Sequence, residues 1–361
     1  MRAAALLLAA ALVSGCARTQ GLGYYWQSVS GHVDLMWRAR PIDDWLADAG
    51  TPGPLKDRLL LAQRLRAFAV SELGLPDNAS YHRYADLGRN AAVYNVVAAP
   101  ALSLSLQTWC FPVAGCVGYR GYYRETDARA FAAGLDPGLE VAVYPVPAYS
   151  TLGWMNWAGG DPLLNTFIRQ PEGELARLLF HELAHQVVYA KDDTTFNESF
   201  ATAVERLGVQ RWLAQAPAPG ARVAYEAFDQ RRRAFRGLTA SVRARLQAVY
   251  GDASLDDAAK LERKARVMAD FRREYEALKA FWGGFAAYDP WVARANNALL
   301  GAQGAYDQLV PGFEALFARE GRDFARFYDA VRALAALPRE ERRARLTGLQ
   351  PLVAGQSGTQ P

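Results

Sequence analysis

The stretch LLFHELAHQVVYAKDDTTFNESFATAVE, from Leu178 to Glu205, decides how this chain builds its candidate functional site. It contains His181 and His185, with Glu182 between them. Residues four apart on an α-helix project from the same face, so both imidazoles can reach one metal ion. Glu182 is rotated by about 100° from His181, which places its carboxylate beside the metal. There it can take a proton from the attacking water and pass it to a leaving amine.

This H-E-x-x-H pattern is typical of zinc metallopeptidases. The residues around it are apolar, which predicts a buried helix, and two imidazoles with a carboxylate would be costly there without a metal. The chain has only four histidines, and two of them fall at ligand spacing. The alternative is a pair of hydrogen-bonded core histidines.

Zinc in a catalytic site needs a third protein ligand and an open fourth position. No histidine follows His185, so carboxylates remain as candidates: Asp192, Asp193, Glu198 and Glu205. Residues 195–208 predict a second helix, with Glu198 near its start beside the apolar stripe. Glu205 is two turns further along on nearly the same face, so spacing leaves both glutamates open. The two loop aspartates are either acceptors for a ligand imidazole or ordinary loop and capping residues.

The sequence HELAHQ followed by NESFA resembles the gluzincins, zinc peptidases whose third ligand is a glutamate on the next helix. FNESFA is similar to the NEGFA-type motif of alanyl-aminopeptidase-like enzymes, which maps the ligand onto Glu198. Only twelve residues separate His185 from Glu198, fewer than in the usual connection of thermolysin-like or aminopeptidase-like members. A short turn can still return one helix against another.

A closer resemblance covers nearly the whole mature chain. The motifs that carry it are YYWQSVSGHVDLM, RLRAFAVSELGLPDNASY, WCFPVAGCVGYRGYY, AYSTLGW, FHELAHQVVY and FNESFATAVE. Together and in this order they resemble a family of bacterial proteins described as putative aminopeptidases. The resemblance implies a zinc-dependent peptidase, an aminopeptidase by description, with one Zn²⁺ per chain.

The N-terminus predicts export. Arg2 is followed by an apolar run over residues 3–13, which is too short for a membrane-spanning helix and fits a secretory signal. VSGC, ending at Cys16, resembles the bacterial lipobox, in which cleavage leaves a lipid-bearing cysteine. Ala17 resembles the sorting pattern for the outer membrane. We therefore expect a signal peptide over 1–15 and a lipid anchor in the envelope facing the periplasm. An ordinary secretory signal is the alternative.

Two cysteines remain after Cys16 is set aside. Cys110 and Cys116 flank a small loop, and export to an oxidising compartment favours a disulfide between them. A metal site with two cysteine ligands is the alternative, but five intervening residues fit no common zinc spacing.

The rest of the chain predicts an α+β fold that is predominantly helical. Residues 90–100, 117–123 and 139–146 predict strands of a small sheet, and 148–154 a further edge strand. Residues 55–73 predict an amphipathic helix, and helix returns at about Glu172. The expected organisation is an anchor and linker over 16–27, a zincin-like core over 28–215, a helical C-terminal part over 216–350 and a disordered tail over 351–361.

A peptide substrate commonly binds by adding a strand to an exposed sheet edge, and residues 148–154 are the candidate edge. GWMN, starting at Gly153, loosely resembles the Gly-x-Met-x-Asn element of aminopeptidases but lacks the glutamate that binds a free amine. Zinc peptidases also need a donor to the oxyanion. The candidates are Tyr149, Tyr189 and Tyr306, and we favour Tyr149.

Two other functions stay open at this point. The chain is also consistent with a zinc-binding envelope scaffold, or with a hydrolase of non-peptide amides. With a net charge of +4 and arginines spread along helical segments, we expect no nucleic-acid partner.

Overall fold

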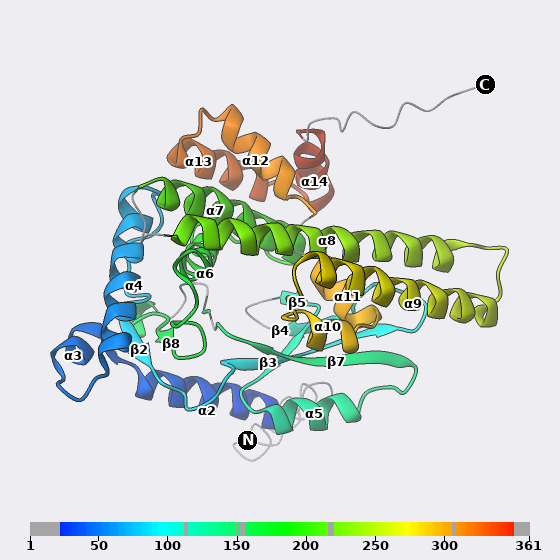
Figure 1. Cartoon of the computed structure of the whole chain (residues 1–361), viewed down its shortest axis with the longest axis horizontal. Coiled ribbons are helices and arrows are strands. Elements are labelled where there is room, and N and C mark those ends of the chain that lie inside the picture. The colour runs from blue at the N-terminus through cyan, green and yellow to red at the C-terminus, as the bar shows by residue number, and fades with distance from the viewer. Residues whose placement is uncertain are drawn as a thin grey trace, which may run out of the picture.

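The computed structural model describes residues 22–111, 115–148, 150–151, 153, 156–215, 220–304 and 308–349. The signal sequence with Cys16, the candidate tyrosines Tyr149 and Tyr306, and the tail over 351–361 lie outside the described residues. The fold is α+β and mainly helical, as the sequence predicts (Figure 1). The zincin-like arrangement of its core and the domain boundaries stay predictions.

The N-terminal part contributes helices α2 (Leu22–Arg38), α3 (Ile42–Ala47), α4 (Gly53–Ser71) and α5 (Glu125–Ala133). The helices of the middle of the chain are α6 (Glu172–Ala184), α7 (Thr194–Ala214), α8 (Ala221–Gly251) and α9 (Asp257–Phe281). The remaining described helices are α10 (Asp289–Ala293), α11 (Asn297–Gly304), α12 (Val310–Arg319), α13 (Phe324–Ala335) and α14 (Arg339–Gly348). No described helix is both long and apolar enough to cross a membrane.

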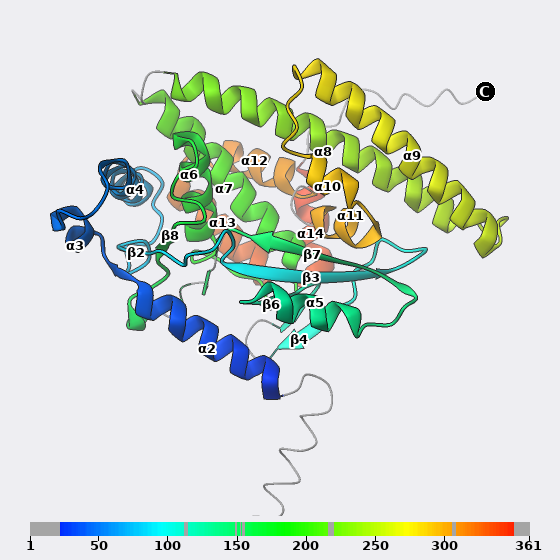
Figure 2. The same cartoon turned by 60° about the horizontal axis from the view of Figure 1, so that its bottom comes forward.

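The central layer of the fold is an antiparallel sheet with the strand order β6–β3–β7. Its strands are β3 (Val93–Pro100), β6 (Arg120–Tyr122) and β7 (Leu139–Val146). Side chains alternate between the two faces of a strand. Val96 faces α5 in one apolar cluster, whereas Val97 faces α11 in another. The sheet is therefore covered on both faces, with α5 below it and α11 above it in Figure 2.

Two smaller sheets complete the strands of the described chain. A mixed sheet joins β1 (Arg40–Pro41), β2 (Arg83–Ala85) and β8 (Leu163–Leu164), and a hairpin joins β4 (Trp109–Phe111) to β5 (Gly115–Val117). Cys110 and Cys116 face each other across this hairpin and form the expected disulfide. The hairpin also contacts the segment between α6 and α7, because the backbone N–H of Cys116 donates to Asp192 (2.9 Å).

The predicted edge strand over 148–154 is wrong for the residues that are described. No strand includes the described residues Ala148, Ser150, Thr151 and Gly153. A short 3₁₀ turn over Asn156–Ala158 follows them. The backbone N–H of Thr151 donates to the buried carboxylate of Asp161 (3.0 Å), so a side chain takes the hydrogen bond that a neighbouring strand would provide. The strand that precedes α6 is β8 instead.

Helices α6 and α7 lie side by side at the centre of the main hydrophobic core (Figure 1). Gly208 of α7 allows this close approach, since a Cβ there would lie 2.7 Å from Leu73 and 2.9 Å from Phe180. On its other side α7 packs against α12, where the rings of Phe196 and Phe313 are 5.1 Å apart. The core of the protein thus combines residues from both ends of the described chain.

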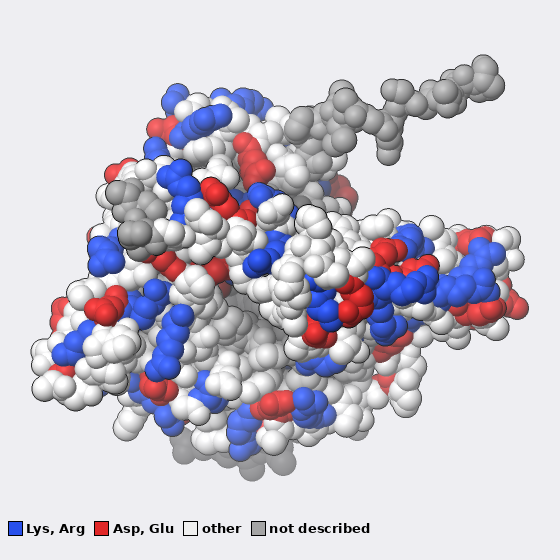
Figure 3. All heavy atoms as spheres, in the orientation of Figure 1, with Lys and Arg blue, Asp and Glu red and all other residues white. Residues whose placement is uncertain are grey.

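Helices α8 and α9 form a long pair with a second apolar core, built around Phe235, Phe271 and Tyr275. Their exposed surface carries acidic and basic side chains in alternation (Figure 3), including the ion pair of Arg245 with Glu274 (2.8 Å). This is the solvated helical surface that the scattered arginines of the sequence predict.

We expect the double variant Cys110→Ser/Cys116→Ser to unfold at lower urea concentration, with a loss of about 2 kcal/mol in the free energy of unfolding. The bond closes a short loop, so the gain from restricting the unfolded chain is modest. Equilibrium unfolding without reductant measures this, with the wild type in reductant as the control. Two alkylatable thiols in the native, unreduced protein would contradict the disulfide.

Candidate metal centre

The candidate metal ligands of α6 lie on one polar stripe of a largely buried helix. The helix begins after Pro171, and Glu172 and Glu174 occupy its first turn, where negative charge is favourable. His181 lies in its last turn and His185 is its C-terminal cap. Both imidazoles therefore project from the same side, as the four-residue spacing predicts.

The short connection between α6 and α7 is held by side chains at the start of α7. Asn197 forms two hydrogen bonds with Ala190, accepting from its N–H (2.7 Å) and donating to its carbonyl (2.8 Å). Asp193 caps α7 by accepting from the N–H of Phe196 (3.3 Å). Asp193 also pairs with Arg343 of α14. These contacts fix the position of Glu198, the residue after Asn197.

Neither loop aspartate lies against an imidazole. The carboxylate of Asp193 is fully buried against arginines of α14. Asp192, which has a positive φ of 61°, accepts from the hairpin at Cys116. The loop aspartates therefore stabilise the turn and the hairpin, which corrects the alternative that one of them holds a ligand imidazole.

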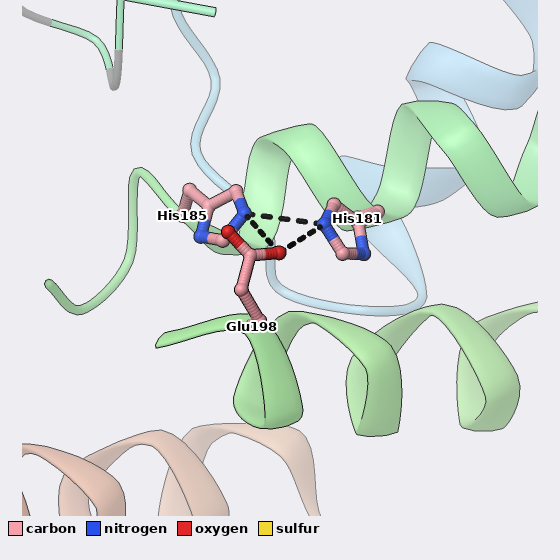
Figure 4. Close-up of side chains that lie close together, drawn as sticks. All are labelled: His181, His185 and Glu198. Atoms are coloured by element: carbon pink, nitrogen blue, oxygen red, sulfur yellow. Dashed lines mark hydrogen bonds and ion pairs between the residues drawn. The ribbon is translucent and has the colours of Figure 1, made fainter. Parts of the chain in front are cut away.

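His181, His185 and Glu198 converge on one point between α6 and α7 (Figure 4). The two Nε2 atoms are 3.2 Å apart. One oxygen of Glu198 lies 3.3 Å from Nε2 of His181 and 3.7 Å from Nε2 of His185. Ligand atoms of a tetrahedral zinc ion, with bonds of about 2.0–2.1 Å, are roughly 3.3–3.4 Å apart. Two of the three separations are close to this spacing and the one between Glu198 and His185 is somewhat longer. The arrangement is thus near that of a zinc site, and two imidazoles with one carboxylate suit that metal.

Glu205 contacts the other edge of the His181 ring. Nδ1 of His181 donates to its carboxylate (3.0 Å), because an ionised carboxylate can only accept. Glu205 is 1% exposed and also pairs with Arg177, one turn before His181 on α6 (3.0 Å). An acceptor on the far nitrogen fixes the tautomer and the ring orientation of a ligand histidine. Glu205 therefore orients His181, and Glu198 is the carboxylate placed among the Nε2 atoms.

The charge network continues from Glu205 to the C-terminal helices. Arg177 pairs with Glu174 (3.0 Å), and Glu174 pairs with the buried Arg232 of α8. Arg232 also lies 3.5 Å from Asp229. A buried carboxylate needs such partners to stay ionised, so α8 takes part in holding the charge of Glu205 beside the metal site.

The pKa shifts of the three residues reflect one buried cluster of imidazoles and carboxylates. Burial lowers the pKa of His181, but hydrogen bonds to Glu198 and Glu205 outweigh this and raise it to about 10. Burial lowers the pKa of His185 to about 4, which leaves a neutral ring with a free lone pair. Burial opposes ionisation of Glu198, yet the two neighbouring imidazoles, including a hydrogen bond from His181, lower its pKa overall. A metal ion can supply the positive charge that a proton on His181 otherwise supplies.

Glu182 lies beside this cluster and lines the same cavity. Burial raises the pKa of Glu182 to about 7, with the charge of Glu198 adding to the rise and that of His181 opposing it. Its carboxylate is hydrogen-bonded to the side chain of Ser150. A carboxylate with this pKa, next to the metal ligands but not among them, can exchange protons near neutral pH.

A cavity of about 410 Å³ opens in front of the three ligands. One wall of the cavity is formed by Val93 and Asn95 of β3. These side chains lie on the face of the sheet that packs against α11 further along the same strand. The hairpin contributes Phe111, and α2 contributes Tyr24. The metal site is therefore open on one side to a space that can hold part of a ligand.

Two tyrosines in this cavity can donate hydrogen bonds near the metal site. Burial, and next the charge of Glu198, raise the pKa of both Tyr119 and Tyr189 above the usual value. The negative charge of Glu182 also contributes to the raised pKa of Tyr119. Of the three tyrosines that the sequence suggests, the structure places Tyr189 here, while Tyr149 and Tyr306 lie outside the described residues.

The family model of the Putative aminopeptidase family matches residues 23–346, which is most of the sequence. The chain belongs to this family. Membership suggests a peptidase with a peptide substrate and agrees with the resemblance seen in the sequence. No curated protein and no solved structure matches the chain significantly.

Several residues of this site are not identifiable from sequence spacing. Tyr119 lies in the VGYRGYY segment, far from the H-E-x-x-H helix, and nothing in its local pattern distinguishes it from a packing tyrosine. Ser150 lies in a stretch that predicts a strand. The role of Asn197 could have been predicted from the sequence, because asparagine at the start of a helix commonly hydrogen-bonds nearby backbone groups.

We expect Glu198→Ala to lose tight zinc binding and Glu205→Gln to weaken it by roughly 10–100-fold. The first change removes a ligand, whereas the second removes only the acceptor that orients His181. Competition with a chromogenic chelator measures both affinities. Glu182→Gln is the matched control, since it changes a carboxylate in the same cavity without removing a ligand. Full zinc affinity in Glu198→Ala, with loss in Glu205→Gln, would reverse the two assignments.

Proposed function

We propose that this chain is a zinc-dependent aminopeptidase, held at the cell envelope by a lipid on Cys16 and facing the periplasm. The observation that supports it most strongly is the open three-ligand site, where His181, His185 and Glu198 converge beside Glu182 at the base of a cavity. Zinc sites with three protein ligands and access to solvent are typical of hydrolytic enzymes. The family suggests a peptide as substrate.

Zinc bound by these residues would polarise a peptide carbonyl and make water a stronger nucleophile. Glu182 accepts the proton of the attacking water and donates it to the departing amine. Its hydrogen bond to Ser150 holds the carboxylate in place, and its raised pKa brings protonated and ionised forms close in energy near neutral pH. Both proton transfers are therefore assigned to one side chain.

The negative charge that develops on the substrate oxygen needs a hydrogen-bond donor. We assign this role to Tyr119, because it lines the cavity and lies within the fields of both Glu198 and Glu182. The reacting carbonyl must lie between the metal ligands and the base, so a donor close to both is well placed. Tyr189 lies near Glu198 as well and is the next candidate.

Selection of a free N-terminal amine requires an acceptor near the cavity. Among the described residues that line it, the carboxylates are Glu182 and Glu198, and both already have a role. The aminopeptidase specificity therefore rests on the family rather than on this lining. Peptides that differ only at the N-terminus separate exopeptidase from endopeptidase action.

A zinc-binding scaffold is the main alternative function. Structural zinc sites are usually closed by four protein ligands, often cysteines. Here three ligand residues face a cavity, and a second carboxylate, that of Glu182, is held next to them without being a ligand. This arrangement favours catalysis.

We expect Glu182→Gln to lower the rate of peptide hydrolysis by roughly 10²–10⁴-fold while zinc content stays near that of the wild type. The substitution keeps the shape and removes the proton acceptor. Initial rates on a peptide library, with each sequence present in free and N-acetylated form, measure the effect. Faster hydrolysis of the free form supports an aminopeptidase. Unchanged hydrolysis in Glu182→Gln would contradict the assignment of the base.

We expect Tyr119→Phe to lower kcat by about 10²–10³-fold with little change in KM, because the lost hydrogen bond forms in the transition state. Tyr189→Phe is the matched control within the same cavity, and Tyr149→Phe tests the tyrosine favoured by the sequence. Steady-state kinetics on the best peptide of the library measure all three. A large loss in either control, with wild-type turnover in Tyr119→Phe, would move the role to that tyrosine.

A further inference from the structure

Helix α2 presents an apolar face to solvent instead of to the core. Its most exposed apolar side chains are Trp26 (74%), Val29 (58%), Val33 (46%) and Trp37 (88%). Their spacing of three, four and four residues places them along one side of the helix. In a surface helix such an apolar stripe normally faces the core. In α2 it faces solvent instead.

The opposite face of α2 is anchored to the protein, which fixes this orientation. Leu35 is fully buried in the main core. Gly31 lies against the ring of Tyr123, where a Cβ would come within 2.2 Å of the ring. The backbone N–H of Tyr123 also donates to the side chain of Gln27 (3.2 Å). Rotating the stripe inward would break all of these contacts.

The chain that precedes α2 indicates what covers the stripe. Only five residues separate Cys16, the predicted lipid anchor, from Leu22 at the start of the helix. Even fully extended, this linker spans roughly 20 Å. A lipid on Cys16 therefore keeps the beginning of α2 close to the membrane surface.

The chemistry of the stripe fits the interface of a bilayer. Tryptophan is enriched at the boundary between lipid headgroups and acyl chains, and a helix lying there buries its apolar side and exposes its polar side. The charged residues of α2, Asp34 and Arg38, pair with each other (3.0 Å). The helix thus brings little net charge, and its attraction to lipid would be mainly apolar.

We propose that α2 is an interfacial membrane-binding helix, which inserts Trp26, Val29, Val33 and Trp37 into the lipid surface beside the anchor. The proposal depends on the envelope location given above, but not on the peptidase activity. Tyr24 and Ser28, on the inner side of the same helix, line the cavity of the metal site. Docking of α2 therefore holds the cavity beside the membrane in a defined orientation.

The test uses the whole mature chain from residue 16 with Cys16→Ser, so that no lipid contributes to binding. Co-sedimentation with vesicles of phosphatidylcholine, alone or mixed with phosphatidylglycerol, gives the partition coefficient, and brominated lipids report tryptophan insertion by quenching. We expect binding to both kinds of vesicle. Trp26→Ser/Trp37→Ser should reduce the partition coefficient by about tenfold or more.

Phe281→Ser is the matched control, because Phe281 is a similarly exposed aromatic residue (79%). It ends α9, which lies on the opposite side of the molecule from α2 in Figure 2, and its loss should leave vesicle binding unchanged. Zinc content and hydrolysis of soluble peptides should match the wild type in both variants, which keeps this test separate from that of the catalytic assignment.

Three outcomes would overturn the proposal. The first is that the unlipidated chain does not bind vesicles. The second is that the double tryptophan variant binds as tightly as the wild type. The third is that sedimentation velocity shows a dimer that Trp26→Ser/Trp37→Ser dissociates while vesicle binding is absent, which would assign the stripe to a second copy of the chain.

Discussion

The hydrogen bond between Nδ1 of His181 and the buried carboxylate of Glu205 is the contact on which the rest of the site depends. It fixes the ring of His181 so that Nε2 points toward His185 and Glu198. A buried carboxylate is stable only with compensating charge, and Arg177 supplies it from one turn earlier on α6. The same helix thus provides a ligand and the partner that keeps the ligand's acceptor ionised.

Helix α7 connects this site to the remainder of the protein. One face carries Glu198 and Glu205 toward α6, while Phe196 and Phe200 pack against the C-terminal helices. Its N-terminal end is held by Asp193, which pairs with Arg343 of α14. Helices late in the sequence therefore support the position of the metal ligands without contacting them.

The cavity in front of the ligands joins segments that are far apart in the sequence. The sheet, the disulfide-bonded hairpin and α2 each contribute a wall. Helix α2 has two functional faces in our proposals, one toward the cavity through Tyr24 and one toward lipid through Trp26 and Trp37. An enzyme arranged in this way would act on peptides close to the membrane that anchors it.

The sequence by itself determined the residues whose relation is local. The spacing of His181 and His185, the start of helix at Glu172, the pairing of Cys110 with Cys116 and the mainly helical α+β class follow from short-range patterns. Spacing could not separate Glu198 from Glu205, because both lie on one face of α7. Only the packing of α7 against α6 decided that Glu198 meets the Nε2 atoms and Glu205 meets Nδ1. The same holds for Tyr119, which lies between β5 and β6 and reaches the cavity only in the folded chain. It also holds for the loop after Ala148, where the buried carboxylate of Asp161 accepts a backbone hydrogen bond that a strand would need.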